Sequence, residues 1–364
     1  MGPQNRLTSL CSFLVLIFFI SVLAEAKDIE IPFHEAWINS PHGDFTDEPF
    51  AHWNEEGTVP EECAACHSTT GRLDYLGADG SEAWVTDSTA PVEEGVQCIA
   101  CHNHVASHLT EVTFTSGMTV NRAEADARCM NCHGGRASGN DVSASIAKAN
   151  VADDEVSSDL RFINIHYAPA AASRFGSEAG GGYEYAGKDY MKFYYHDDFA
   201  TQCNDCHSPH STEVRVELCT ECHQGVSEFE DIAAIRSTEG DFDGDGDLSE
   251  GIKYEVEGLR EILSEAIGLY ANEVAGSAIV YGNGYPYFFN DKNGNGIADA
   301  DELARSNGYS NWTPRLLKAA YNYQVVTKDH GAYVHNPQYM LQLLNDSIQD
   351  LGEKISVPAT ARPE

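Results

Sequence analysis

The most informative feature of the sequence is the pattern Cys-x-x-Cys-His, which occurs five times. Two thiols separated by two residues can form thioethers with the two vinyl groups of one haem, and the adjoining histidine can bind its iron. A zinc half-site or a redox dithiol needs the cysteine pair but not the histidine after it. The pattern therefore predicts five covalently attached c-type haems. Their attachment residues are Cys63, Cys66, His67, Cys98, Cys101, His102, Cys129, Cys132, His133, Cys203, Cys206, His207, Cys219, Cys222 and His223.

Each haem iron has a second axial face, and the histidines outside the motifs outnumber the positions to be filled. They are His34, His42, His52, His104, His108, His166, His196, His210, His330 and His335. This abundance predicts six-coordinate, bis-histidine haems of low potential, which require no methionine ligand. The neighbouring residues favour a distal role for one subset. These candidates are His42 and His52 on an aromatic-rich segment, His166 in an apolar stretch, His196 after a Tyr-rich run, and His210 close behind the fourth motif.

Residues 1–26 have the pattern of a removable secretory signal. Arg6 supplies a positive charge, Leu10 to Leu23 is apolar but short for a membrane span, and Ala24-Glu25-Ala26 is a small-residue cleavage site. Cys11, the one cysteine outside the motifs, would be removed with this segment. We therefore expect a secreted, periplasmic or extracellular protein without a membrane span. No thiol would remain for a disulfide, so the haems would act as the covalent staples.

The formal net charge of −35 at pH 7 limits the partners of the chain. It argues against nucleic acid and anionic membrane surfaces, because both repel a strongly acidic protein. Cations, basic redox proteins and extracellular electron acceptors remain suitable partners. The alternative is that the net charge has no partner and only keeps the protein soluble in a salty medium.

Composition divides the mature chain into two parts. Residues 27–232 carry the motifs among Gly-rich and Pro-rich loops, and we expect a pentahaem cytochrome c domain, mostly α with extensive loops and packed around haem. A short β-hairpin is predicted at 180–196. Residues 233–355 show helical periodicity from Ile252 to Val274 and helix-start signals at Thr313-Pro314 and Asn336-Pro337, which predict a small helical calcium-binding domain before a flexible tail at 356–364.

Two acidic loops in the second part match the calcium loop of EF-hands. Residues 291–302 fit the twelve-residue pattern, with oxygen ligands from Asp291, Asn293, Asn295, the Ile297 carbonyl, Asp299 and Glu302. The other loop offers Asp241, Asp243, Asp245 and Asp247 but has Ile252 at the twelfth position, so Glu250 or Glu255 would have to complete the shell. We expect one or two Ca²⁺ ions in a structural role; a solvated acidic turn is the alternative.

The mature chain resembles a group of secreted bacterial multihaem c-type cytochromes in which a C-terminal calcium-loop domain follows the haem motifs. The resemblance is carried by His52-Trp53, Cys129-Met130-Asn131-Cys132-His133, Gly181-Gly182-Tyr183, Ser208-Pro209-His210 and Val334-His335-Asn336-Pro337. The haem part is also similar, in haem density and short stretches, to extracellular cytochromes that polymerise into conductive filaments. This similarity implies a homopolymer as one mode of assembly.

These features favour an electron-transfer protein without catalytic residues over an enzyme. Electrons would pass along the haems outside the cytoplasmic membrane. The alternative is a multihaem reductase of a nitrogen or sulfur oxyanion, in which one haem keeps an open face beside a proton-donating His or Arg. A third reading is a calcium-stabilised scaffold with structural haems.

Overall fold

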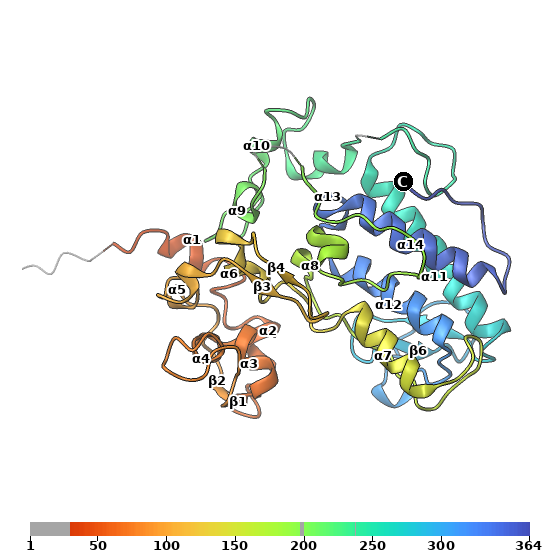
Figure 1. Cartoon of the computed structure of the whole chain (residues 1–364), viewed down its shortest axis with the longest axis horizontal. Coiled ribbons are helices and arrows are strands. Elements are labelled where there is room, and N and C mark those ends of the chain that lie inside the picture. The colour runs from red at the N-terminus through yellow and green to blue at the C-terminus, as the bar shows by residue number, and fades with distance from the viewer. Residues whose placement is uncertain (1–29, 197–199, 237) are drawn as a thin grey trace, which may run out of the picture.

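The computed structural model describes residues 30–196, 200–236 and 238–364. Within these ranges the protein is mostly helical, with long loops and three two-stranded sheets. Figure 1 shows two groups of elements side by side, one from the N-terminal part of the chain and one dominated by the C-terminal helices. No helix in the described ranges is both long and apolar enough to cross a membrane. The expected signal at 1–26 lies outside the described residues.

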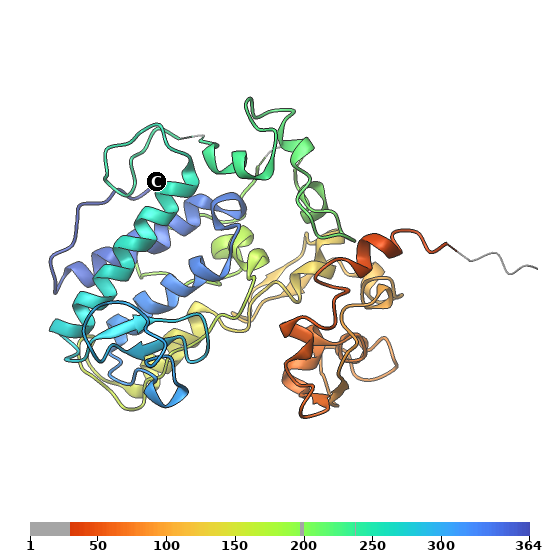
Figure 2. The ribbon, with the colours of Figure 1, turned by 180° about the vertical axis from the view of Figure 1, so that it is seen from behind.

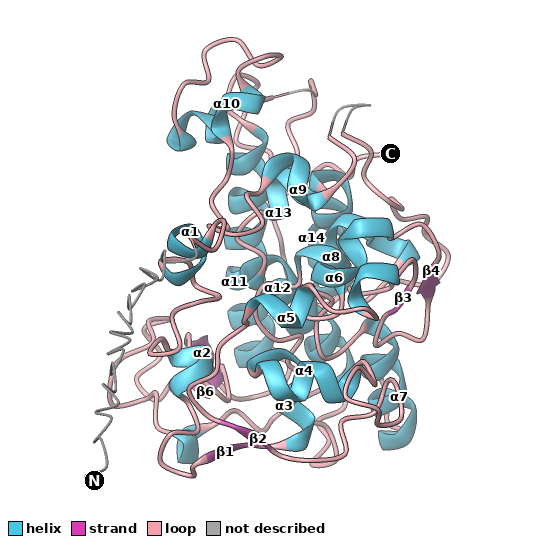
Figure 3. Ribbon diagram, turned by 90° about the vertical axis from the view of Figure 1, so that its left-hand side faces the viewer, coloured by secondary structure: helices cyan, strands magenta, loops and turns pink. Residues whose placement is uncertain are grey.

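The N-terminal group is made of short elements. Its helices are α1 (His34–Ile38), α2 (Glu48–Ala51), α3 (Glu61–His67), α4 (Thr69–Tyr75), α5 (Cys98–Cys101) and α6 (Ala127–Met130). Its antiparallel strand pairs are β1 (Thr58–Val59) with β2 (Ala90–Pro91), and β3 (Val112–Thr113) with β4 (Thr119–Val120). Loops therefore make up most of this group, as Figure 3 shows.

The middle of the chain connects the two groups. Its helices are α7 (Gly139–Ala149), α8 (Ala170–Phe175), α9 (Cys203–Cys206) and α10 (Val216–Cys219). Figures 1 and 2 show α8 between the groups and α9 and α10 projecting beyond them. Single 3-10 turns complete the described structure at η1 (Ala106–His108), η2 (Glu124–Asp126), η3 (Gly176–Glu178), η4 (Phe229–Ala234) and η5 (Arg305–Asn307).

The C-terminal group confirms the predicted helices. They are α11 (Ile252–Glu273), α12 (Pro314–Lys328), α13 (Ala332–His335) and α14 (Pro337–Gly352), with a hairpin of β5 (Ile279–Tyr281) and β6 (Phe288–Asn290) between α11 and α12. Thr313 caps α12 by accepting from Leu316 N at 3.1 Å, and Asn336 caps α14 by accepting from Tyr339 N at 3.1 Å. The apolar face of α11 packs against α12 and α14.

The predicted β-hairpin at 180–196 is wrong, because this segment contains no strand. Its backbone groups bond instead to side chains of the C-terminal helices. Gly182 N donates to the Tyr339 hydroxyl at 3.1 Å, Tyr183 N to Asn322 Oδ1 at 2.7 Å, and Met191 N to Gln342 Oε1 at 2.7 Å. The segment therefore lies extended over α12 and α14. Side chains of these helices accept its backbone N–H groups, so it needs no second strand as a hydrogen-bond partner.

Three hydrophobic cores are present among the described residues. The largest core joins the C-terminal helices to Val142, Leu160, Ile165 and Tyr190, so residues from the expected haem domain are part of it. By contrast, the core around the first motif contains Val59, Ala64 and Ala90. The region of the last two motifs adds Val226 and Ile232 among its described residues. The core at the third motif is larger and holds ten buried residues, Phe114 and Met130 among them.

Candidate haem-binding site

Each motif lies on a short helical turn that gathers its three functional side chains. In the last four motifs the histidine N donates to the carbonyl of the first cysteine, at 2.8 Å for His102, 3.0 Å for His133, 2.9 Å for His207 and 2.9 Å for His223. Residues three and four apart on a helical turn lie on the same face. The turn therefore presents both thiols and the imidazole to one haem-sized group. The ten described cysteines form no disulfide, so all are available for thioether formation.

Every motif histidine lies close to a second histidine ring from another part of the chain. The ring centres are 5.8 Å apart for His67 and His166, 6.1 Å for His102 and His210, 6.3 Å for His133 and His42, 6.4 Å for His207 and His335, and 5.9 Å for His223 and His196. A bond from a metal to imidazole nitrogen is about 2 Å long, so rings on opposite sides of one ion have centres about 6 Å apart. The five pairs thus have the spacing that one iron between two imidazoles requires.

Hydrogen bonds orient several of these rings through Nδ1. His67 Nδ1 donates to the Pro49 carbonyl at 2.7 Å, and His133 Nδ1 donates to the Ala168 carbonyl at 3.1 Å. His207 Nδ1 is 3.4 Å from the Thr212 carbonyl. A proton held on Nδ1 leaves the lone pair on Nε2, which is the nitrogen that then binds a metal.

The surroundings also keep two of the rings neutral. Burial, together with the facing His133, lowers the pKa of His42 to about 4. Burial lowers the pKa of His166 to about 4 as well, with a further contribution from His67. Both imidazoles are therefore uncharged at neutral pH, the state in which histidine binds metals.

The backbone at His166 is held in a conformation that non-glycine residues seldom adopt. His166 has φ +82°, and its N donates to Asn164 Oδ1 at 2.9 Å. The preceding Ile165 is fully buried, and its carbonyl accepts from Arg136 N at 2.8 Å. The buried Ile165 and the Asn164 side chain thus fix a strained residue, a pattern that is concentrated at functional sites.

The geometry departs from the sequence-based candidates at one pair. His52 is exposed, its ring contacts Trp53, and its Nδ1 is 2.8 Å from Glu48 Oε1. The ring opposite His67 is His166, and the ring opposite His207 is His335, which sequence reasoning did not select. Sequence proximity to the first motif pointed to His52. The usable signal for His335 was its position directly before the Asn336 cap, which ties it to a fixed helix start.

Contacts between motifs show which attachment sites adjoin each other. Cys132 Sγ in the third motif is 3.9 Å from the Ala65 carbonyl in the first, and Arg72 Nη2 donates to Asn131 Oδ1 at 2.9 Å. The thiols of Cys66 and Cys132 lie close enough to shift each other's pKa, raising that of Cys66 and lowering that of Cys132. The first and third motifs are therefore neighbours, although the second lies between them in sequence.

A similar junction joins the third and fourth motifs. Asp126, just before the third motif, accepts from Cys203 N at 2.8 Å, and Arg174 bridges Asp126 Oδ2 at 3.3 Å and Cys203 Sγ at 3.9 Å. The thiols of Cys129 and Cys203 lie close enough to shift each other's pKa, lowering that of Cys129 and raising that of Cys203. The second motif joins this group through the pairing of His102 with His210. The third motif thus lies next to the first and the fourth.

The two predicted calcium loops share one hydrogen-bond pattern. In the 291–302 loop, Asp291 accepts from Gly294 N at 2.7 Å and Gly296 N at 2.8 Å. In the other loop, Asp241 accepts from Gly244 N at 2.7 Å and Gly246 N at 3.0 Å. These four glycines have φ between +71° and +92°, which favours glycine. Both loops therefore have the same backbone conformation up to the carboxylate that would complete the calcium shell, here called the closing carboxylate.

The closing carboxylates occupy matching places. Glu302 Oε1 accepts from Lys292 N at 2.7 Å, and Glu255 Oε2 accepts from Phe242 N at 2.7 Å, so each bonds the residue after the first aspartate. Glu302 is only 1% exposed, yet its Oε2 has no hydrogen-bond partner among the described residues. A buried carboxylate oxygen without a partner is costly unless a cation binds it.

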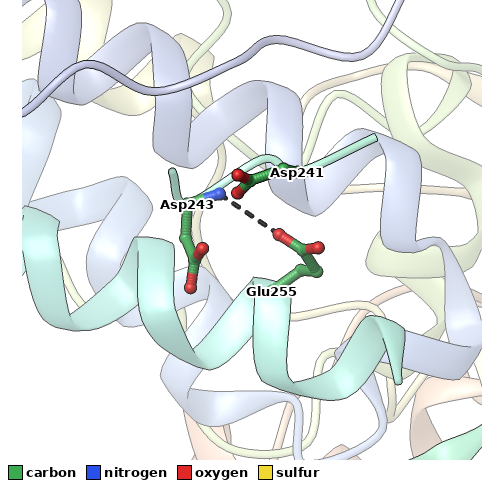
Figure 4. A group of neighbouring side chains, drawn as sticks. All are labelled: Asp241, Asp243 and Glu255. Atoms are coloured by element: carbon green, nitrogen blue, oxygen red, sulfur yellow. Dashed lines mark hydrogen bonds between the residues drawn. The ribbon is translucent and has the colours of Figure 1, made fainter. Parts of the chain in front are cut away.

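Carboxylates converge most closely at the loop with the less regular sequence. Oxygens of Asp241, Asp243 and Glu255 lie within 4.8 Å of one another, and so do those of Asp243, Asp245 and Glu250. Figure 4 shows the two loop aspartates beside the first turn of α11, which carries Glu255. Both Glu250 and Glu255 therefore adjoin the loop aspartates. Two further predicted ligands make local hydrogen bonds: Asp247 accepts from Ser249 N at 2.8 Å, and Asp299 accepts from the side-chain amides of Asn293 and Asn295.

Comparisons with known proteins agree with the motif geometry. A family model described as the doubled CXXCH motif matches residues 90–138, which contain the second and third motifs. C-type polyheme cytochrome OmcB of Geobacter sulfurreducens is 27% identical over 381 residues, covering 86% of this chain and 47% of OmcB. C-type polyheme cytochrome OmcC of the same species is 28% identical over 375 residues, covering 84% of this chain and 44% of OmcC.

The chain therefore spans less than half the length of these curated relatives. No solved structure matches it. The doubled motif and the similarity over most of the chain support placing this protein among the multihaem c-type cytochromes.

Proposed function

We propose that the protein carries electrons along five covalently bound haems, each with two axial histidines. The observation that carries this proposal is that every motif histidine has a second histidine nearby, with 5.8 to 6.4 Å between the two ring centres. On this account the distal ligands are His166, His210, His42, His335 and His196, for the first to fifth motifs in that order. This set includes His335 and omits His52, which was one of the five sequence-based candidates.

The contacts between motifs support a continuous route. Electron transfer requires haems that lie close to one another, and thioether sulfurs mark haem edges. Because Cys132 contacts the Ala65 carbonyl of the first motif, and Asp126 beside the third motif accepts from Cys203 N, the third haem would link the first to the fourth. The first four haems would then form one connected group, with the second joined through His210.

The same pairing disfavours the reductase alternative. A reductase of a nitrogen or sulfur oxyanion needs an open face on one iron for its substrate. Here each motif histidine has a candidate partner on the opposite side, so no face is left for a substrate. Electron transfer without catalysis is therefore the better account of this arrangement.

Calcium would stabilise the C-terminal group in this account. The ligands would be Asp291, Asn293, Asn295, the Ile297 carbonyl, Asp299 and Glu302 in the regular loop. In the other loop, Glu255 would close the shell around Asp241 and Asp243, because it bonds the loop backbone as Glu302 does. A cation would offset the repulsion among these buried and half-buried carboxylates.

Location outside the cytoplasmic membrane and assembly into a homopolymer are further parts of the proposal. The net charge of −35 opposes self-association, and divalent cations would reduce this repulsion. His42 lies opposite His133 within the chain, so it would not complete a haem of another subunit. The exposed His34 on α1 could lie at a subunit contact, but the proposed pairing leaves it no haem face to complete. Electron microscopy at millimolar calcium tests assembly; monomers under all calcium and salt conditions would contradict it.

Two measurements test the electron-transfer function. The intact mass of acid-denatured protein should exceed the polypeptide by five haems, because thioether-linked haem survives denaturation. Voltammetry of the adsorbed protein should then show reversible transfer of five electrons per chain, with no catalytic current when nitrite or sulfite is added. Four haems or fewer would refute the haem count. A sustained catalytic current would favour the reductase.

A further inference from the structure

The distal ring of the fourth axial pair is held by a carboxylate. His335 Nδ1 lies 2.8 Å from Asp329 Oδ1 and 2.9 Å from Asp329 Oδ2, so a ring proton is shared with a carboxylate. For His67, His133 and His207 the Nδ1 partner is a neutral backbone carbonyl. The fourth motif therefore has a full negative charge behind one of its two facing imidazoles.

The surroundings of Asp329 preserve that charge. The residue is 3% exposed, and its Oδ1 also accepts from Gly331 N at 3.1 Å. In the described part of the chain neither Lys nor Arg forms an ion pair with it. Arg174, whose charge acts on His335, pairs with Asp126 at 3.3 Å.

The adjoining Lys328 is also turned away from the carboxylate. Its Nζ lies 3.5 Å from the centre of the Tyr167 ring. Buried charges without a counter-ion are screened little by solvent or salt, so the carboxylate acts on His335 at nearly full strength.

We propose that Asp329 lowers the reduction potential of the haem on Cys203, Cys206 and His207 by polarising His335. The inference rests on the proposed ligation of that haem by His335. A carboxylate that accepts the Nδ1 proton makes the imidazole a more basic ligand, and a more basic ligand stabilises ferric iron over ferrous iron. Asp329 is thus a tuning residue that acts through a ligand.

The test is a spectroelectrochemical titration of full-length holoprotein carrying Asp329→Asn. Asparagine keeps the size of the side chain and can still accept from Gly331 N and from His335 Nδ1, but it has no charge. We expect one of the five haems to move to a more positive potential, the other four to stay in place, and the ferric spectrum to remain low-spin.

Glu48→Gln is the matched control, because Glu48 makes the same 2.8 Å contact with His52, which is not opposite a motif histidine. Its side chain is 76% exposed, so solvent screens the charge, and no haem potential should move.

Two results would overturn the inference. Unchanged potentials in Asp329→Asn would show that the charge is not felt at the iron. A new high-spin ferric signal in that variant would show that Asp329 only holds His335 in place. The variant His335→Ala tests the ligand assignment separately. A high-spin haem in this variant would confirm that His335 is a haem ligand. A fully low-spin spectrum would show that His335 is not a ligand, and the proposed ligation would then be wrong.

Discussion

The rings of His102 and His210 lie 6.1 Å apart with their planes only 8° from parallel. His210 belongs to the turn after the fourth motif, yet its partner is the histidine of the second. Phe33 stacks on His210 with ring centres 4.5 Å apart and planes at 5°, so His210 is held in a fixed orientation. The fold therefore sets the relative orientation of the two imidazoles as well as their distance.

The angles between the ring planes predict the paramagnetic spectrum of the ferric protein. Near-parallel axial rings split the two iron d orbitals that they contact, whereas near-perpendicular rings leave them close in energy. We expect one rhombic low-spin signal from the 8° pair and two strongly anisotropic signals from His67 with His166 at 78° and His223 with His196 at 72°. Low-temperature electron paramagnetic resonance checks this, and His210→Ala should remove the rhombic signal. Its persistence in that variant would contradict the assignment.

Replacing a distal histidine should affect one haem alone. His42→Ala removes the ring 6.3 Å from His133, so one haem per chain should become high-spin and able to bind carbon monoxide. His52→Ala is the control, because His52 is exposed and contacts Trp53 instead of a motif histidine. Visible and magnetic circular dichroism spectra report the spin state of both variants. Equal spectra for the two variants would argue against the pairing.

Removal of calcium should loosen the C-terminal group first. A site occupied at a hundred times its dissociation constant stabilises the fold by about 2.7 kcal/mol, so a chelator should lower the melting temperature of α11, α12 and α14. Glu302→Gln should reproduce much of this loss, since Glu302 is buried at the loop. Asp301→Asn, an exposed neighbour outside the ligand positions, should melt like the wild type. A melting temperature, measured by calorimetry, that does not change with chelator would show that the loops are solvated turns without calcium.

Acid should weaken the helical core through Asp154. Burial opposes ionisation of this carboxyl, but hydrogen bonds from Arg315, Lys354 and Tyr270 outweigh it and lower its pKa to about 2. Because the folded pKa is below the ordinary value of 3.8, the stabilisation is present above about pH 4 and disappears as pH falls through 2. Asp154→Asn should therefore cost about 2 kcal/mol at pH 7 and almost nothing at pH 2.

Asp153→Asn provides the neighbouring comparison for this experiment. Asp153 pairs with Lys318 at 3.1 Å, but its side chain is 55% exposed, so its loss should change the unfolding free energy by less than about 1 kcal/mol. Denaturant unfolding at both pH values, followed by circular dichroism, measures both variants. A cost for Asp154→Asn that does not change with pH would contradict the linkage.

Local sequence predicted those parts of the molecule that depend on short-range chemistry. The attachment residues follow from a five-residue pattern, and α12 and α14 begin at Thr313-Pro314 and Asn336-Pro337 because the caps satisfy their own first turn. The distal partners depend on contacts between distant segments, and the one local feature that set His335 apart from His52 was the Asn336 cap directly after it. The supposed hairpin at 180–196 failed for the same reason, since its backbone partners are the side chains of Asn322, Tyr339 and Gln342.

The central claim is that every haem iron has two histidine ligands, and carbon monoxide titration of the fully reduced protein at neutral pH tests it most directly. Six-coordinate haems have no free position, so the visible spectrum should not change and no gas should be taken up. Uptake of one or more molecules of carbon monoxide per chain would show an open iron. That result would contradict the pairing of all five motif histidines and would favour the reductase.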